Sequence, residues 1–364
     1  MLRCGTPISG LQSPWTHPDD MAKRILCFGE LLLRLGAPGR ETLLQTPALQ
    51  VCVGGAEANV AVSLARFGHQ AGMAGTVADN ALGKAAVAEL RGHGVDTSAL
   101  RMAPGRMGLY FLASGSGHRP SAVLYDRAGS AFASADPAGY DWPALLEGID
   151  CLHLSGVTPA LGQRAADAAS AAARAARAAN AMVSFDGNFR AQLWAAWDGD
   201  PAAILHGLLQ ETDLAFADHR DIDMVLGDTA GDVQHGAVDA AARFEAAAQR
   251  AFAAFPRLQR IATTVRTQHS VDQHGLGALM ATRGGALHRA PDYQLSAIVD
   301  RIGAGDAFAA GVLHGLLSGM ADDDSLRFGL AAACLKHSVP GDFNLVDVDE
   351  VLALVRNERL DVKR

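Results

Sequence analysis

Basic charge, paired cysteines and metal-binding motifs are all scarce in this sequence. Lys and Arg total 31 against 39 Asp and Glu, and the net charge of −8 argues against the basic surface that binds nucleic acid. The five cysteines are scattered, without the C-x-x-C spacing typical of zinc or redox sites. The 13 histidines are dispersed and no H-E-x-x-H occurs, so we expect no metal site built by the protein alone.

Membrane and export signals are lacking as well. No apolar run approaches the roughly 20 residues that cross a bilayer, and the first residues do not follow the charged, apolar, small-residue order of a secretory signal. We therefore expect a cytoplasmic protein with reduced thiols that acts on a small molecule and has neither nucleic acid nor membrane as a partner.

The composition is that of a globular enzyme. With 364 residues, 49% of them hydrophobic, the chain can bury a large core, and its length fits one large α/β domain or two ordinary ones. Residues 1–22 mix Gly, Pro, Ser and Thr without a period, so we expect a disordered N-terminal extension there. The folded domain is expected over residues 23–360.

Short apolar runs alternate with segments of helical period along most of this domain. Residues 25–28, for example, are apolar throughout and stop at Gly29, which is typical of a strand buried on both faces. We expect strands at 25–28, 71–76, 151–154, 182–185, 214–216 and 260–264, and helices at 56–67, 82–92, 161–179, 201–209 and 237–254. This order predicts an α/β fold with a doubly wound parallel sheet flanked by helices.

Two segments follow a different pattern. Residues 31–53 and 104–128 contain short, partly alternating runs, such as 109–112 and 122–125, that are broken by Gly and Pro. We expect them to form the strands of a small second sheet, which would act as a lid.

The most informative segment is Gly303-Ala304-Gly305-Asp306, at the start of a long apolar helix. A Gly-x-Gly turn at a helix N-terminus presents free backbone N–H groups that stabilise phosphate, so we expect an anion hole there. Asp306 can accept a proton from an alcohol while these amides hold the charge on a transferring phosphate. The alternative is that Asp306 is only the N-cap of the helix. The two glycines favour the catalytic interpretation.

Two other phosphate-binding motifs are incomplete in this sequence. Gly83-Lys84 is followed by Ala85 and lacks the first glycine of a P-loop, and residues 303–308 lack the third glycine of a dinucleotide fingerprint. The sequence therefore predicts a phosphoryl-transfer site of another type, with Mg²⁺ carried largely by the nucleotide.

Two longer motifs carry a resemblance to a known family. They are Gly54-Gly55-Ala56-Glu57-Ala58-Asn59-Val60-Ala61 and Asp300-Arg301-Ile302-Gly303-Ala304-Gly305-Asp306. The first is similar to the sugar-binding G-G-A-x-x-N-x-A, and the second to the D-T-x-G-A-G-D, of the ribokinase-like (phosphofructokinase B type) carbohydrate kinases, with Arg301 at the usual Thr. The resemblance runs from residue 24 to about 355. It implies a ribokinase-like fold, ATP and Mg²⁺ as cofactors, and Asp306 as general base.

Three further motifs narrow the resemblance. They are Gly29-Glu30 with Arg34, Tyr125-Asp126-Arg127-Ala128-Gly129-Ser130-Ala131, and Asp186-Gly187-Asn188-Phe189-Arg190 with Leu193-Trp194. These resemble the G-E-x-x-x-R, Y-x-R-x-G-S-A and D-x-N-x-R…L-W of the 2-keto-3-deoxygluconate kinases. The reaction implied is the ATP-dependent phosphorylation of 2-keto-3-deoxygluconate to its 6-phosphate.

The resemblance also implies roles for single residues. The sugar site would include Gly54, Gly55, Asn59, Tyr110, Tyr125, Arg127, Arg190 and Asp306, and the nucleotide site Asn188, Arg190, Arg266, Gly303 and Gly305. Arg127 and Arg190 would bind the substrate carboxylate, which a guanidinium recognises in a bidentate manner. The alternatives are a surface charge for each arginine, strand packing for the tyrosines, and a helix-terminal amide for Asn59.

Two segments depart from the family pattern or extend it. The usual N-x-x-E appears as Asp218-His219-Arg220-Asp221, so a metal role for Asp221 stands against a plain loop acid. Residues 336–342 resemble the segment that closes the adenine side of the site.

Other interpretations stay open. One is a kinase of a neutral sugar such as fructose or ribose, or of the epimer 2-keto-3-deoxygalactonate; another is a non-catalytic sugar-acid sensor on the same fold. Arg127 and Arg190 disfavour neutral sugars, the intact glycine turn disfavours the sensor, and nothing in the sequence separates the epimers. An exposed small sheet would favour a homo-oligomer.

Overall fold

The computed structural model describes residues 22–227 and 240–357. The extension expected over residues 1–22 lies almost wholly outside this part, as do the first three residues of the helix expected at 237–254. Within the described ranges, none of the helices has the length and apolar character that a membrane span requires.

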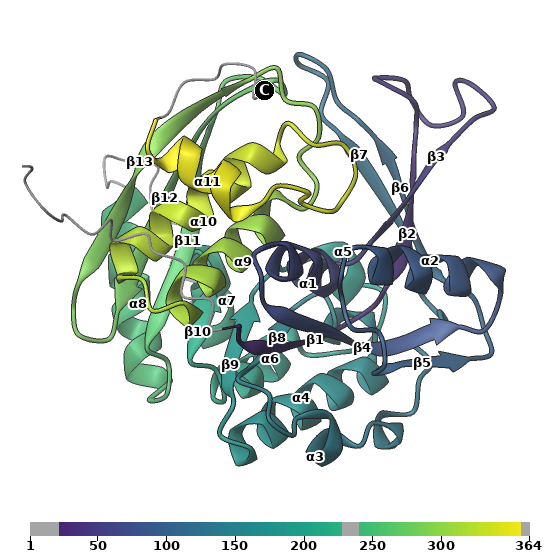
Figure 1. Cartoon of the computed structure of the whole chain (residues 1–364), viewed down its shortest axis with the longest axis horizontal. Coiled ribbons are helices and arrows are strands. Elements are labelled where there is room, and N and C mark those ends of the chain that lie inside the picture. The colour runs from purple at the N-terminus through teal and green to yellow at the C-terminus, as the bar shows by residue number, and fades with distance from the viewer. Residues whose placement is uncertain (1–21, 228–239, 358–364) are drawn as a thin grey trace, which may run out of the picture.

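A nine-stranded sheet forms the centre of the molecule, in the order β13-β12-β11-β10-β9-β8-β1-β4-β5 (Figure 1). Its strands are β1 (Arg24–Phe28), β4 (Gln70–Ala78), β5 (Leu100–Ala103), β8 (Cys151–Ser155), β9 (Met182–Asp186), β10 (Leu214–Phe216), β11 (Arg260–Gln268), β12 (Gln273–Thr282) and β13 (Leu287–Ser296). Every strand expected from the apolar runs lies in this sheet.

The sheet is parallel from β5 to β11, but β12 and β13 continue it as an antiparallel edge. The sequence interpretation did not include this edge. The outermost strand, β13, is largely exposed and contains Pro291, so it lacks the continuous apolar run that marks a buried parallel strand.

Alternate residues of β1 face two separate cores. Ile25 and Cys27 belong to one core and Leu26 and Phe28 to the other, as the two-residue period of a strand buried on both faces requires. Helices on the first face are α1 (Ala56–Arg66), α2 (Ala81–Gly92), α9 (Ala304–Leu317), α10 (Asp322–Lys336) and α11 (Val348–Val355). Those on the second are α3 (Trp142–Leu145), α4 (Gln163–Ala178), α5 (Ala191–Trp194), α6 (Pro201–Leu209), α7 (His219–Leu226) and α8 (Ala240–Ala254), with 3-10 turns at Pro137–Gly139 and Pro159–Leu161.

A second, four-stranded sheet projects away from these layers (Figure 1). Its order is β3-β2-β6-β7, with β3 (Gln50–Gly54), β2 (Leu32–Gly36), β6 (Gly108–Ala113) and β7 (Ala122–Asp126). All four lie in the two segments where a small sheet was expected, except that β3 extends to Gly54. Because β2 follows β1 after a short turn, the small sheet is anchored beside the carboxyl end of β1.

The two faces of the small sheet differ in character. On one face, Arg34, Tyr110 and Tyr125 lie opposite one another in register on β2, β6 and β7. On the other face, an apolar row crosses all four strands and consists of Val51, Leu35, Phe111 and Leu124. The two ends of this row, Val51 and Leu124, are each 59% exposed.

Candidate active site

Two adjoining cavities open where the parallel strands of the large sheet end. The large-sheet cavity, of about 900 Å³, is lined by the ends of β9, β10 and β11 and by α7, α9 and α10. The inter-sheet cavity, of about 710 Å³, lies between the small sheet and the start of α9. The residues that line both are Asp186, Asn188, Arg190, Arg266, Gln268, Arg301 and Gly305. The cavities therefore share a junction, in the position where α/β folds bind their ligands.

Asp306 lines the inter-sheet cavity beside this junction, in the first turn of α9 and next to Gly305, which lines both cavities. The N-cap of α9 is Gly303, with φ of 80°, and Asp306 is the third helical residue. Its carboxylate accepts a hydrogen bond from Asn59 Nδ2, with Oδ2 at 2.6 Å, and makes no capping bond to the helix. The alternative that Asp306 is only an N-cap is therefore wrong.

Two of the expected glycines make room for Asp342. A Cβ atom at Gly303 would overlap the Asp342 carbonyl oxygen, and one at Gly54 would overlap the Asp342 carboxylate. Gly303 lines the inter-sheet cavity together with Gly55 and Asn59, whereas Gly54 does not. Gly54 thus contributes by leaving room for Asp342, which itself lines the inter-sheet cavity.

Burial raises the pKa of two carboxyl groups, those of Asp306 and Asp186, toward neutral pH. Desolvation raises the pKa of Asp306 to about 7, against the opposing effects of the Asn59 hydrogen bond and the Arg190 charge. Desolvation, followed by the charge of Asp306, raises the pKa of Asp186 to about 8. A carboxylate with such a pKa is suited to accept a proton near neutral pH.

Asp342 is a cavity residue that the sequence interpretation missed, because its segment was placed on the adenine side. The Tyr110 hydroxyl donates to its Oδ2 at 2.7 Å, and Arg34 Nε lies 3.2 Å from its Oδ1. Arg34 also pairs with Asp300, at 2.8 Å. The sequence signal that could have revealed Asp342 was Arg34, because an arginine in a buried strand requires acidic partners. His337, from the same segment, does line the large-sheet cavity.

The two expected tyrosines lie on the cavity face of the small sheet. Tyr110 and Tyr125 are directly opposite in register, with ring centroids 6.5 Å apart, and both line the inter-sheet cavity. Tyr110 is buried and bonded to Asp342, so it is not plain strand packing.

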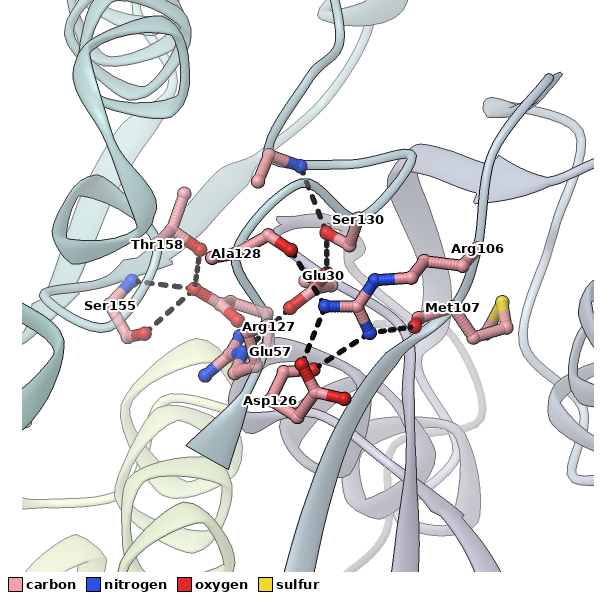
Figure 2. Close-up of polar contacts among 11 residues, drawn as sticks. Glu30, Glu57, Arg106, Met107, Asp126, Arg127, Ala128, Ser130, Ser155 and Thr158 are labelled. Carbon is pink, nitrogen blue, oxygen red and sulfur yellow. Dashed lines mark hydrogen bonds and ion pairs between the residues drawn. The ribbon is translucent and has the colours of Figure 1, made fainter. Parts of the chain in front are cut away.

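Arg127 lines the same cavity but is already paired. Its Nε donates to Glu30 Oε2 at 2.6 Å, and the two side chains are 5% and 1% exposed. The Ser130 hydroxyl donates to the other oxygen of Glu30 (Figure 2). Arg127 is therefore a buried donor whose charge is paired with Glu30, and its expected role in binding the substrate carboxylate stays a prediction.

Figure 2 also shows a second buried carboxylate, that of Glu57. It accepts hydrogen bonds from the Ser155 hydroxyl and the Thr158 hydroxyl, each at 2.7 Å. Burial raises the pKa of Glu57, and these hydroxyls and the charge of Arg127 oppose the shift. The start of α1 is thus tied to the turn that follows β8.

Three arginines at the junction differ from Arg127. Arg190, Arg266 and Arg301 each line both cavities, and none of them has an ion pair with any residue in 22–227 or 240–357. Arg190 Nη1 donates only to the Phe189 carbonyl, at 3.0 Å. Unpaired guanidinium groups around a cavity indicate an anionic ligand. Arg301 was noted in the sequence only as a departure from a motif.

The acidic residues of the large-sheet cavity are arranged differently from the expectation. Asp221 does not lie in a loop. It lies in the first turn of α7, where it forms a capping box with the N-cap residue Asp218. Desolvation and the charge of Asp218 raise the pKa of Asp221 to about 6. Asn188, with φ of 39°, lines both cavities.

Among the described residues, no group of three or more His, Cys, Asp or Glu side chains could enclose a metal ion. Mg²⁺ characteristically uses one or two protein carboxylates and completes its shell with phosphates and water. Asp186 and Asp221 both line the large-sheet cavity and fit this limited requirement.

Comparison with known proteins gave consistent matches. The family model described as pfkB family carbohydrate kinase matches residues 22–347. A 2-dehydro-3-deoxygalactonokinase of Haloferax volcanii is 31% identical over 344 residues, which cover 94% of this chain and 100% of the relative. A 2-dehydro-3-deoxygluconokinase of Bacillus subtilis is 27% identical over 333 residues, covering 90% and 93%.

Solved structures agree with the observed fold. The crystal structure of 2-dehydro-3-deoxygluconokinase from Thermotoga maritima has a TM-score of 0.85 at 33% identity and covers 92% of this chain and 99% of that one. Fructokinase with bound ATP from Xylella fastidiosa has a TM-score of 0.74 at 25% identity, covering 92% and 98%. The family match over residues 22–347 includes the strands of both sheets.

Proposed function

Because the chain belongs to the pfkB family of carbohydrate kinases, we propose that it transfers the terminal phosphoryl group of ATP to the 6-hydroxyl of 2-keto-3-deoxygluconate. The observation that carries this proposal is the position of Asp306. Its carboxylate is held by Asn59 at the junction of two cavities, beside the glycine turn that opens α9. A base, an anion hole and two binding spaces thus meet at one point.

Each of the two cavities binds one of the two substrates. ATP occupies the large-sheet cavity, near Asn188 and Arg266, and its terminal phosphate reaches the junction. The sugar acid occupies the inter-sheet cavity, flanked by Tyr110 and Tyr125. The small sheet acts as a lid that keeps water from the phosphate, so that transfer goes to the sugar and not to solvent.

Asp306 accepts the proton of the sugar hydroxyl as its oxygen bonds to phosphorus and the bond to the ADP oxygen breaks. The amides of the glycine turn, at the positive end of α9, stabilise the negative charge on the phosphoryl oxygens. Asp186 and Asp221 would hold Mg²⁺, which would neutralise charge on the nucleotide phosphates.

The carboxylate of the sugar acid is recognised by guanidinium groups. Arg190 lines the inter-sheet cavity and forms no close ion pair with a described residue, although its charge opposes the rise in the pKa of Asp306, Asp186 and Asp221. Arg127, held by Glu30, provides directional hydrogen bonds from a fixed position. Relatives named as kinases of ketodeoxy sugar acids support an acid over a neutral sugar.

The epimer 2-keto-3-deoxygalactonate is a second candidate substrate. It is favoured by the Haloferax volcanii relative, which bears the galactonokinase name and is covered over its full length. The two acids differ in the configuration of one hydroxyl, which the residues of the inter-sheet cavity would have to distinguish.

We further propose that the outer face of the small sheet mediates homo-oligomerisation. The apolar row of Val51, Leu35, Phe111 and Leu124 is exposed at both ends. A second copy of the chain would bury this row through a symmetric contact.

A direct test is ADP release by the purified protein with Mg·ATP and each of 2-keto-3-deoxygluconate, its galactose epimer, fructose and ribose. The proposal predicts the highest kcat/KM with a ketodeoxy acid. Preference for fructose or ribose would overturn the acid assignment, and no turnover with any substrate would favour the sensor.

A further inference from the structure

Arg301 lies two residues before Gly303, the N-cap of α9, at the position where the family motif noted in the sequence has Thr. Its carbonyl oxygen accepts a hydrogen bond from Ala304 N at 3.4 Å, which couples its backbone to the turn. Its side chain is partly buried and lines both the large-sheet and the inter-sheet cavity. A side chain in this position lies on the route between the nucleotide and the sugar.

The charge of Arg301 is uncompensated by the protein. Within the described residues it has neither an ion pair nor a side-chain hydrogen bond, and burial lowers its pKa. Arg266 is close enough that the charge of Arg301 helps to lower the pKa of Arg266, after burial. Two neighbouring guanidinium groups repel each other and lose hydration on burial, so this arrangement is stabilised when an anion of high charge binds between them.

By contrast, a neighbouring arginine of the same cavity is satisfied by the protein. Arg220 forms an ion pair with Asp218. Arg301 has no such partner among the residues that the structure describes, and it lies at the junction, where the terminal phosphate of ATP would lie.

We propose that Arg301 contacts the phosphoryl group during its transfer and acts as a catalytic residue together with the amides of the glycine turn. This inference rests on the proposed kinase function and adds a residue to its transition-state machinery. A guanidinium stabilises the charge that spreads over the three phosphoryl oxygens. Thr at this position would provide a hydroxyl but no positive charge.

The proposal distinguishes the terminal phosphate from the rest of the nucleotide. Loss of the guanidinium should weaken binding of AMP-PNP, which carries a γ-phosphate, and should leave the affinity for ADP unchanged. It should lower kcat by about 100-fold, comparable with the loss of one oxyanion-hole donor. The KM for the sugar acid should not rise.

The test compares Arg301→Thr and Arg301→Lys with the wild-type protein and with Arg289→Thr, an exposed arginine of β13. Calorimetry measures AMP-PNP and ADP binding, coupled ADP release measures kcat and KM, and thermal unfolding checks the fold. We expect Arg301→Thr to lose AMP-PNP affinity selectively, Arg301→Lys to retain part of kcat, and Arg289→Thr to match the wild type.

Three results would overturn the proposal. They are an unchanged ratio of AMP-PNP to ADP affinity, a wild-type kcat in Arg301→Thr, and a rise confined to the KM of the sugar acid, which would place the guanidinium on the sugar. If Arg301→Thr does not fold, the same measurements on Arg301→Lys test the proposal. The binding experiment needs no sugar, so an error in the proposed substrate would leave this test intact.

Discussion

The Glu30–Arg127 pair offers the sharpest prediction about stability. Glu30 follows β1 of the large sheet and Arg127 follows β7 of the small sheet, so their 2.6 Å contact joins the two sheets. Both side chains are almost fully buried. We consider Glu30→Gln and Arg127→Met, alone and combined.

Either single substitution leaves a buried charge or polar partner without compensation, which typically costs about 3–5 kcal/mol. For 364 residues the unfolding entropy is roughly 0.8 kcal/mol per kelvin, from about 2.1 cal/mol/K per residue, so the melting temperature should fall by about 4–6 °C. The double variant removes both charges and should be less destabilised than the sum of the singles, with a coupling of about 2–3 kcal/mol. Lys84→Met, which breaks an exposed pair with Asp79, should cost less than about 1 kcal/mol.

Urea unfolding followed by circular dichroism measures all four variants. The same proteins should show a raised KM for the sugar acid in both single variants, because Arg127 loses either its partner or its donors, and an unchanged KM for ATP. Additive destabilisation by the two single substitutions would refute the claim that this pair joins the sheets energetically.

Four further outcomes are expected. Asp306→Asn should lower kcat by about 100- to 10,000-fold in the ADP-release assay while it retains nucleotide binding, and an unchanged kcat would exclude Asp306 as base. The pKa of Asp306, raised to about 7, predicts that log kcat/KM rises with pH up to about 7 and then levels, since only the unprotonated carboxylate accepts a proton; a flat profile from pH 5 to 8 would contradict this. Because the pKa of Asp306 is raised from 3.8 to about 7 in the folded state, its contribution to stability is lost progressively between these two pH values, so Asp306→Asn should gain more melting temperature relative to wild type at pH 8 than at pH 5. Leu124→Lys should shift a homo-oligomer to monomer in light scattering with kcat retained, and an unchanged mass would exclude the small-sheet face as the interface.

Much of the fold was predictable because the strands of the parallel sheet are buried on both faces. Residues such as 25–28 are apolar without alternation, and so short an apolar run that stops at a glycine is typical of a central parallel strand. The outermost antiparallel strand, β13, was not predictable in the same way, since it is largely exposed and contains polar residues and Pro291.

The active site was predictable where its chemistry lies in one short segment. The glycine turn and Asp306 are consecutive in sequence, so their proximity requires no knowledge of the fold. By contrast, Glu30 and Arg127 are separated by 97 positions, and Tyr110 and Asp342 by 232. Only the tertiary structure reveals that Arg127 pairs with Glu30 and that Asp342 lines the inter-sheet cavity.

The most direct test of the central claim is to follow the phosphate itself. Phosphorus NMR of a reaction with Mg·ATP and 2-keto-3-deoxygluconate should show a new phosphate monoester, coupled to the protons on carbon 6, with the wild-type protein and almost none with Asp306→Asn at equal nucleotide occupancy. Inorganic phosphate as the only product, or the same ester formed equally fast by Asp306→Asn, would contradict the account.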